Sequence, residues 1–304
     1  MKVFLSLVAA ILVSFCAAAQ PVVKEDRTVK ISEHVFVIPD ELVPMVPNVG
    51  IVVGSRATLV VDPGMGLRSG EAVLREVAKL TANSELYIVN THFHPEHTTG
   101  EAAFPRSAKI IRAAAQQQDI EEVGMAWVKN FASRSPVIAE VLQGITAFRA
   151  PDEIFESEKM LDLGGVRVRL VRLGPGHTRG DTVFFVEQDR VLFSGDLVMS
   201  RLFPAFATPQ SRSSSWLESL DALDAFRALH LVPAHGELTD ASTIGAYRGY
   251  LQALRVRVAQ LKRAGKSADD TVEALRGEFR AKYPDWQQPL RILGAVHVIY
   301  AEFP

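Results

Sequence analysis

Residues 91–100 hold three histidines and a glutamate within six positions, and this cluster constrains the chain more than any other feature. The stretch reads Thr-His-Phe-His-Pro-Glu-His-Thr-Thr-Gly and follows an apolar run, residues 86–89, that is typical of a buried strand. Neutral imidazoles and carboxylate oxygens are ligands that zinc prefers. Because the chain has only eight histidines in 304 residues, we interpret the cluster as a metal site rather than a histidine-rich polar loop.

The spacing within the cluster suggests how it would bind metal. Alternate residues of an extended segment point the same way, so His92 and His94 can bind one ion. A turn at Pro95 would direct Glu96 and His97 toward a nearby point, where a second ion could lie. The motif alone therefore allows one ion or two.

Three more metal-type side chains occur later in the chain. His177, Asp196 and His235 each come just after an apolar segment with strand character, as His92 and His94 do. We therefore expect all five to lie in loops along one edge of a sheet, where distant parts of the sequence can form a single site.

Other candidate residues have weaker signals. Asp62 ends a strand-like segment, and it is either a turn former or a carboxylate at the floor of the metal site. His34, His230 and His297 lack a strand-end context, so we assign them to the surface or the core. Four aromatic residues are candidate walls of an apolar pocket: Trp127, Phe148, Phe203 and Phe206.

Strand-like and helix-like segments occur in two similar runs. Strands are predicted over residues 28–38 (as a pair), 48–54, 57–62, 86–90, 109–111, 153–155, 160–163, 166–171, 182–186, 190–193 and 230–234. Helices are predicted over residues 69–81, 113–131, 211–229, 239–263 and 267–282. Residues 131–149 are expected to form a long connection of the kind that often has a function.

Composition narrows the choice of partner. With 48% hydrophobic and 22% charged residues, the chain has ordinary globular composition. Its formal net charge of −2 lacks the basic excess that nucleic-acid binding usually shows. We expect a small-molecule substrate and no nucleic acid, and the sequence gives no indication of an oligomeric state.

The first nineteen residues resemble a secretory signal peptide. Lys2 precedes the apolar run 3–15, and Ala17 to Ala19 provide small residues for cleavage near Ala19. The run is short for a membrane span, so we expect export to the periplasm or medium rather than a stable membrane anchor. Cys16 is the only cysteine, and the mature chain would have no disulfide and no thiolate ligand.

These motifs, in this order, resemble those of the metallo-β-lactamase superfamily. The matching segments are Val61-Asp62-Pro63-Gly64, the 91–100 stretch, Gly176-His177-Thr178, Ser194-Gly195-Asp196 and Pro233-Ala234-His235-Gly236. The resemblance implies an α/β fold, a four-layer αββα sandwich with a metal site at one edge. It implies one domain over residues 20–304, with C-terminal helices from about residue 239.

The resemblance also implies a ligand set for two zinc ions. His92, His94 and His177 would hold the first ion, His97 and His235 the second, and Asp196 would bridge both. Glu96 stands where the family usually has aspartate, and its longer stem leaves open whether it ligates the second ion or acts as a base. The expected cofactor is therefore one zinc ion or two.

The expected activity is hydrolysis by a metal-bound hydroxide, because zinc lowers the pKa of bound water from about 15.7 to near 7. Glu96 and Asp196 are the predicted catalytic carboxylates. A β-lactam substrate and a lactone or other ester fit comparably well, since Asp196 at the bridging position resembles the thioesterase and lactonase branches. The alternative is an exported metal-binding protein of the same fold with little or no catalytic activity.

Overall fold

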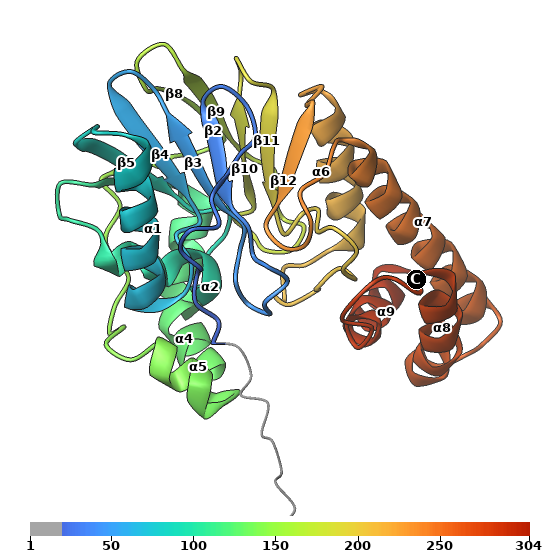
Figure 1. Ribbon diagram of the computed structural model, residues 1–304. Helices are drawn as coiled ribbons and strands as arrows, with labels where there is room; N and C mark the ends of the chain where they lie inside the picture. Colours follow the sequence, from blue (N-terminus) through green and yellow to red (C-terminus); the bar gives the residue numbers. More distant parts are fainter. Residues whose placement is uncertain (1–19) are drawn as a thin grey trace, which may run out of the picture.

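The computed structural model describes residues 20–304, in which two β-sheets stack face to face (Figure 1). Residues 1–19, the predicted signal peptide, lie outside the described part of the chain. The first sheet has the order β1-β2-β3-β4-β5-β6-β7. Its strands are β1 Val29–Lys30, β2 Val35–Ile38, β3 Val49–Val53, β4 Ala57–Val61, β5 Glu85–Val89, β6 Lys109–Ala113 and β7 Glu153–Phe155. Strands β4 to β7 are parallel to one another, so their carboxyl ends meet at one edge.

The second sheet has the order β12-β11-β10-β9-β8. Its strands are β8 Glu158–Asp162, β9 Arg167–Arg172, β10 Thr182–Val186, β11 Val191–Gly195 and β12 His230–Pro233. Only the β11–β12 pair is parallel. The hairpins predicted around residues 55–56 and 164–165 are confirmed as β3–β4 and β8–β9.

The side chains of each strand alternate between two apolar layers, as the two-residue period of a strand requires. In β4, Leu59 and Val61 point between the sheets, whereas Val60 faces the helix on the outer side. In β10, Phe184 lies between the sheets and Phe185 faces the opposite helical layer. The central strands of both sheets are thus buried on two faces, which explains the almost uninterrupted apolar sequences of β3, β4, β10 and β11.

Helices cover both outer faces, and the predicted four-layer αββα sandwich is confirmed. Helix α1 (Gly66–Leu80) packs on the first sheet through Ala72, Val73 and Val77. Helices α6 (Ser213–Asp224), α7 (Ser242–Arg263), α8 (Ala268–Lys282) and α9 (Arg291–Glu302) share an apolar cluster with the second sheet. Figure 1 shows α7, α8 and α9 extending beyond the sandwich. No helix within residues 20–304 has the length and apolar character needed to cross a membrane.

The helical prediction for residues 113–131 is confirmed except at Ala113, which is the last residue of β6. Helix α3 (Ala114–Asp119) continues through a π-helical turn (Ile120–Gly124) into α4 (Met125–Ser133). The phenyl ring of Phe148 lies against Gly124, where a Cβ atom would be only 2.9 Å from it.

Two other predictions need correction. The expected connection 131–149 contains helix α5 (Pro136–Val141), which begins with Pro136 at its first position and with the Ser135 hydroxyl accepting a hydrogen bond from Ile138 N. The helix predicted to reach residue 229 ends at Asp224.

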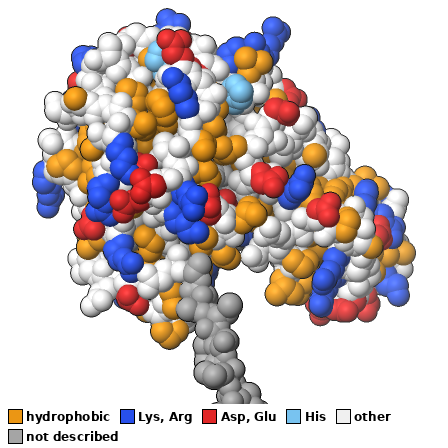
Figure 2. Space-filling view, viewed as in Figure 1, with side chains coloured by type: hydrophobic (Ala, Val, Ile, Leu, Met, Phe, Trp, Pro, Cys, Tyr) orange, Lys and Arg blue, Asp and Glu red, His pale blue; other side chains and the backbone are white. Residues whose placement is uncertain are grey.

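Figure 2 shows acidic and basic side chains interspersed on the face of the molecule that is seen in Figure 1.

Candidate metal centre

The histidine motif begins where β5 ends. His94 caps the short helix α2 (Pro95–Thr98), and Pro95 occupies its first position, where no backbone N–H is needed. The turn is held by the Thr98 hydroxyl, which donates to His94 O at 2.9 Å. As a result Glu96 and His97 fold back beside the two preceding histidines, and all four side chains are buried.

Three imidazoles form the first cluster. The Nδ1 atom of His94 lies 3.0 Å from Nε2 of His92 and 3.2 Å from Nε2 of His177. Zinc–nitrogen bonds of about 2.0–2.1 Å in tetrahedral geometry place ligand nitrogens about 3.3 Å apart. The three nitrogens therefore have the spacing expected of ligands to one ion.

A second cluster lies beside the first and shares Asp196 with it. Asp196 Oδ1 is 3.8 Å from Nε2 of His97 and 3.7 Å from Nε2 of His235. Asp196 Oδ2 lies 3.5 Å from Nε2 of His177 in the first cluster. Glu96 Oε1 completes the second cluster, 4.0 Å from His97 Nε2. Asp196 is thus positioned between two sets of metal-type ligands.

Several of these atoms are buried without a hydrogen-bond partner among the described residues. They are His97 Nε2, Glu96 Oε2 and Asp196 Oδ1. Buried polar atoms are normally paired, because leaving one unpaired costs about 1–3 kcal/mol. Metal ions at the two clusters would satisfy these atoms, so the residues present fit the metals that the resemblance implies.

The outer nitrogens of the histidines fix the direction of the rings. His235 Nδ1 lies 2.9 Å from Val46 O, and His177 Nδ1 lies 2.6 Å from Ala205 O. Carbonyl oxygens only accept, so each Nδ1 carries the proton and each Nε2 presents its lone pair to the clusters. The indole ring of Trp127 stacks on His94, with ring centroids 4.3 Å apart.

Asp62 lies directly beneath the second cluster. Its carboxylate accepts from Thr91 N at 2.7 Å, from Thr91 Oγ1 at 2.7 Å and from His97 Nδ1 at 3.0 Å. Its backbone adopts a φ of 54°, which is uncommon for a residue other than glycine and costs conformational energy. Of the two roles predicted for Asp62, the structure favours the floor of the site, where it orients a candidate ligand.

Burial and neighbouring carboxylates shift the pKa values of the cluster histidines in opposite directions. Burial, reinforced by the surrounding imidazoles, lowers the pKa of His92 and His94 well below its usual value. Burial also lowers the pKa of His235 to about 4. Burial opposes the charged form of His97 too, but the carboxylates of Asp62, Asp196 and Glu96 outweigh it and raise its pKa to about 9. His92, His94 and His235 are therefore neutral at pH 7 and can bind a metal ion without losing a proton, whereas His97 is protonated.

The loop 40–48 connects the first sheet to the His235 loop. Asp40 accepts from Gly236 N at 2.8 Å, and the Asn48 amide donates to Pro233 O and Gly236 O at 2.9 and 2.8 Å. Glu41, Leu42 and Met45 have φ values of 51°, 56° and 63°. Three such conformations in five residues are a local strain of the kind found at functional sites.

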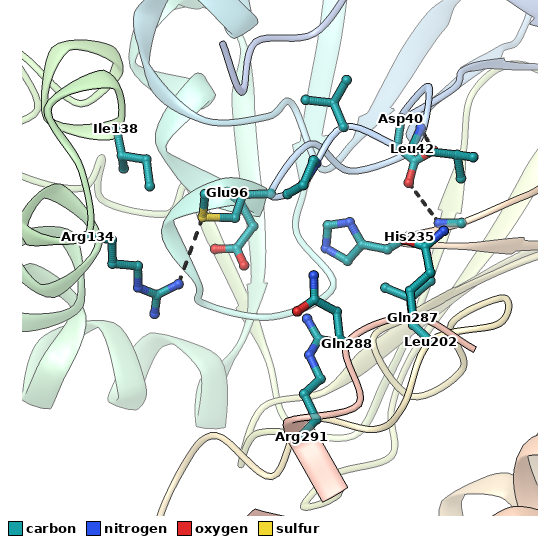
Figure 3. Close-up of a pocket in the computed structure, with 14 residues that line it drawn as sticks. Asp40, Leu42, Glu96, Arg134, Ile138, Leu202, His235, Gln287, Gln288 and Arg291 are labelled. Carbon is teal, nitrogen blue, oxygen red and sulfur yellow. Dashed lines mark hydrogen bonds between the residues drawn. The ribbon is translucent and has the colours of Figure 1, made fainter. Parts of the chain in front are cut away.

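This loop forms one wall of a cavity of about 390 Å³ that opens onto Glu96 and His235 (Figure 3). Apolar side chains from residues 42–45 line that wall, together with Ile138 and Leu202. Polar groups line the rest of the cavity, among them Arg134, Gln287, Gln288 and Arg291. The cavity gives a small molecule direct access to the second cluster.

A model of the metallo-β-lactamase superfamily matches residues 42–235, which is more than half of the chain and includes every candidate ligand. The chain belongs to the metallo-β-lactamase superfamily. The match begins at the cavity loop and ends at His235, so α7, α8 and α9 lie outside it.

Curated relatives within this superfamily are named as hydrolases of different esters. A linear primary-alkylsulfatase from Pseudomonas is 26% identical over 59% of this chain and 39% of the relative. The human acyl-coenzyme A thioesterase MBLAC2 is 30% identical over 58% of this chain and 66% of the relative. The chain thus spans less than two thirds of the length of each.

Solved structures share the fold. A metallo-β-lactamase from Pontibacter korlensis superposes with a TM-score of 0.59 at 20% identity, over 74% of this chain and 98% of that chain. A sec-alkylsulfatase from Pseudomonas superposes with a TM-score of 0.68 at 14% identity, over 91% of this chain and 50% of that chain. The second match leaves out less than a tenth of this chain. It therefore includes most of the residues that form the C-terminal helices.

The structure brings together all the residues predicted as ligands. They form the groups His92-His94-His177, His92-His97-Asp196 and Glu96-His97-His235, each compatible with a bound ion. The expectation of a single sheet edge is wrong, because His92 and His94 follow β5 of the first sheet whereas His177, Asp196 and His235 belong to loops of the second. The centre therefore lies where the two sheets of the superfamily fold meet.

None of the four aromatic residues predicted as pocket walls lines the cavity beside the metal clusters, although Phe206 lines a separate hollow with Leu290 and Arg291. Phe203 is fully buried against Tyr250 and Trp286, in the core formed by the C-terminal helices. Trp127 contacts the site, but through stacking on His94. Sequence reasoning also missed the cavity residues Asp40, Arg134 and Arg291, for which only the turn-forming sequence Pro-Asp near residue 40 gave any signal.

Proposed function

We propose that this protein is a hydrolase that binds two zinc ions and cleaves an ester, thioester or lactone. The observation that supports it is the pair of adjacent ligand clusters, joined by Asp196 and open to the cavity through Glu96 and His235. Hydrolysis is also the reaction named for the relatives in the same superfamily.

The metal ions, when bound, act as Lewis acids and lower the pKa of coordinated water. The residues of the chain provide the rest of the chemistry. Asp196 lies between the two clusters and presents one carboxylate oxygen to each. Asp62 accepts a hydrogen bond from His97 Nδ1 and so keeps Nε2 of that ring directed toward the second cluster. Glu96 reaches the second cluster at the cavity wall, where its carboxylate completes the ligand set beside His97 and His235.

A second candidate substrate is a sulfate ester. The structural match that covers 91% of this chain is to an alkylsulfatase, and Arg291 lines the cavity as a candidate partner for a sulfate group. A β-lactam is a third possibility, supported by the shared sandwich fold. The formal net charge of −2 supports a small molecule over nucleic acid.

The test is a substrate panel on protein of measured metal content. Nitrocefin, an acyl-homoserine lactone, an acyl-coenzyme A, an aryl ester and an alkyl sulfate cover the candidate classes. We expect His94→Ala to lose both bound zinc and turnover, because His94 Nδ1 is the shared neighbour of the first cluster. The exposed His297 provides the matched control, and His297→Ala should keep both. Full activity in His94→Ala would refute the assignment.

Glu96→Asp separates an active hydrolase from a metal-binding protein without turnover. If Glu96 is the reason that the protein has no activity, Glu96→Asp should produce activity on at least one substrate of the panel. If the glutamate is a working ligand, the shorter side chain should weaken the second metal site and lower turnover. Zinc binding with no turnover in either protein would contradict the hydrolase proposal.

We also propose that the protein is exported. The support is the signal-like sequence of residues 1–19. Expression in a bacterium followed by N-terminal sequencing of the periplasmic fraction should give a chain that starts near Gln20. Retention of residues 1–19 in a cytoplasmic protein would contradict export.

A further inference from the structure

Two arginines face the cavity from different parts of the chain. Arg134 follows the last residue of α4, and Arg291 is the first residue of α9. Figure 3 shows Arg134, Glu96, Gln288 and Arg291 arranged around one space. Burial lowers the pKa of Arg134, the nearby Glu96 carboxylate opposes this shift, and the charge of Arg291 is close enough to add to it.

Neither guanidinium group has an anionic partner. Among residues 20–304, no carboxylate oxygen lies within 4.0 Å of either one, although many other arginines of the chain form such pairs. Arg134 contacts only Asn130 Oδ1 at 3.1 Å, Met45 Sδ at 3.9 Å and the ring of Phe131. Arg291 contacts Phe203 O at 3.2 Å and Met199 Sδ at 3.4 Å. Each therefore keeps donors free, since a guanidinium group has five.

The charge balance of the site also favours an anion. Two divalent ions and the two guanidinium groups would outweigh the four carboxylates of Asp40, Asp62, Glu96 and Asp196. A cavity with excess positive charge and low-dielectric walls concentrates anions. It binds them more tightly than the same charges would on an open surface. The wall formed by residues 42–45, in contrast, is apolar and suits a hydrocarbon group.

We propose that Arg134 and Arg291 together bind an anionic group of the substrate, while the apolar wall 42–45 holds its hydrocarbon part. This inference rests on the proposed function, because it assigns the cavity beside the second metal cluster to the substrate of that reaction. The shared chemistry is an amphipathic anion, either a carboxylate or a sulfate ester. Gln288, with a φ of 61°, extends its amide into the same space and can donate a further hydrogen bond.

Binding of ligands that cannot be hydrolysed tests the proposal apart from turnover. The probes are 1-octanesulfonate, octanoate and 1-octanol, titrated calorimetrically into zinc-loaded protein. We expect both anions, or one of them, to bind at least about tenfold more tightly than octanol. Arg134→Gln and Arg291→Gln should each weaken anion binding by about tenfold to a hundredfold, the size of a charged hydrogen bond, and affect octanol far less.

Controls separate a lost charge from a damaged fold. Arg276 is an exposed arginine on α8, and Arg276→Gln should bind all three probes as the natural protein does. Arg134→Lys and Arg291→Lys should recover part of the lost affinity, because they keep the charge without the planar fork. Each variant must show unchanged zinc content and melting temperature. Equal affinity for the anions and octanol, or anion affinity unaffected by both glutamine variants, would overturn the proposal.

Turnover distinguishes this inference from the proposed function. If both arginine variants lose the anions but no substrate of the panel is cleaved, the anion site stands and the hydrolase proposal fails. If neutral and anionic esters are cleaved alike by the natural protein and by both variants, the hydrolase proposal stands and the anion site fails. A preference for octanesulfonate indicates a sulfate ester as the natural anion, and a preference for octanoate indicates a carboxylate.

Discussion

Asp62→Asn is expected to empty the second metal cluster while the first keeps its ion. The aspartate accepts three hydrogen bonds, two from Thr91 and one from His97 Nδ1 at 3.0 Å. An asparagine keeps one acceptor oxygen for Thr91 N but presents an NH2 group where Oδ2 was. The Thr91 hydroxyl can turn and accept from it, whereas His97 Nδ1 would face a donor with its own proton.

The histidine can avoid this clash only by moving its proton to Nε2. That change removes the lone pair that His97 directs toward Asp196 and the second cluster. Loss of a hydrogen-bonding group behind a metal ligand typically costs tenfold to a hundredfold in metal affinity, about 1.4–2.7 kcal/mol. We expect a loss of this size at the second cluster and a smaller one at the first, because Asp62 bonds His97 directly but reaches His92 only through Thr91 Oγ1, 3.2 Å from His92 Nδ1.

The assay is a zinc titration in competition with a chromophoric chelator, with metal content after dialysis measured by mass spectrometry. The natural protein should hold two ions, and Asp62→Asn should retain close to one. Asp162 provides the control, since it accepts from Gly164 N and Gly165 N in an exposed turn far along the chain from the ligands. Two ions bound with unchanged affinity in Asp62→Asn would refute the reasoning.

Two further predictions concern charge at buried positions. Because His97 has a pKa of about 9 without metal, it is protonated at pH 7 and must lose that proton to bind an ion. The zinc affinity of the second cluster should therefore rise about tenfold per pH unit up to pH 9 and then level off. Calorimetry in buffers of different ionisation enthalpy should detect the proton that His97 releases on zinc binding. Zinc binding without proton release would contradict this prediction. Arg112→Met leaves Glu101 buried without its ion-pair partner, which should lower the free energy of unfolding by about 3–5 kcal/mol in urea titrations. Arg257→Met removes an exposed ion pair with Glu278 and should change the free energy of unfolding by less than about 1 kcal/mol. Equal losses in the two variants would show that burial of the first pair carries no extra stability.

Local sequence signals were sufficient for much of the fold. Alternation and turn residues located the strands, because a half-buried or buried strand leaves its pattern in four to six consecutive residues. The position of His92, Asp196 and His235 just after such segments predicted their convergence, since side chains at strand ends meet at a common edge. The structure adds that two sheets supply these edges, which depends on long-range packing that no local pattern records.

Features that depend on contacts between distant segments were not predictable from the sequence. Arg134 and Arg291 are ordinary surface-type residues until α4 and α9 bring them to the same cavity. The loop 40–48 gains its role only when Asp40 and Asn48 bond to the His235 loop. Phe203 was placed in a pocket because an aromatic side chain has the same local signal in a cavity wall and in a core.

Anomalous diffraction at the zinc edge, from crystals grown with zinc, would locate bound ions at the two clusters. We predict one peak about 2 Å from His92 Nε2, His94 Nδ1 and His177 Nε2, and a second within bonding distance of Glu96, His97 and His235, with Asp196 between them. No peak at either cluster, or zinc bound elsewhere on the chain, would contradict this prediction.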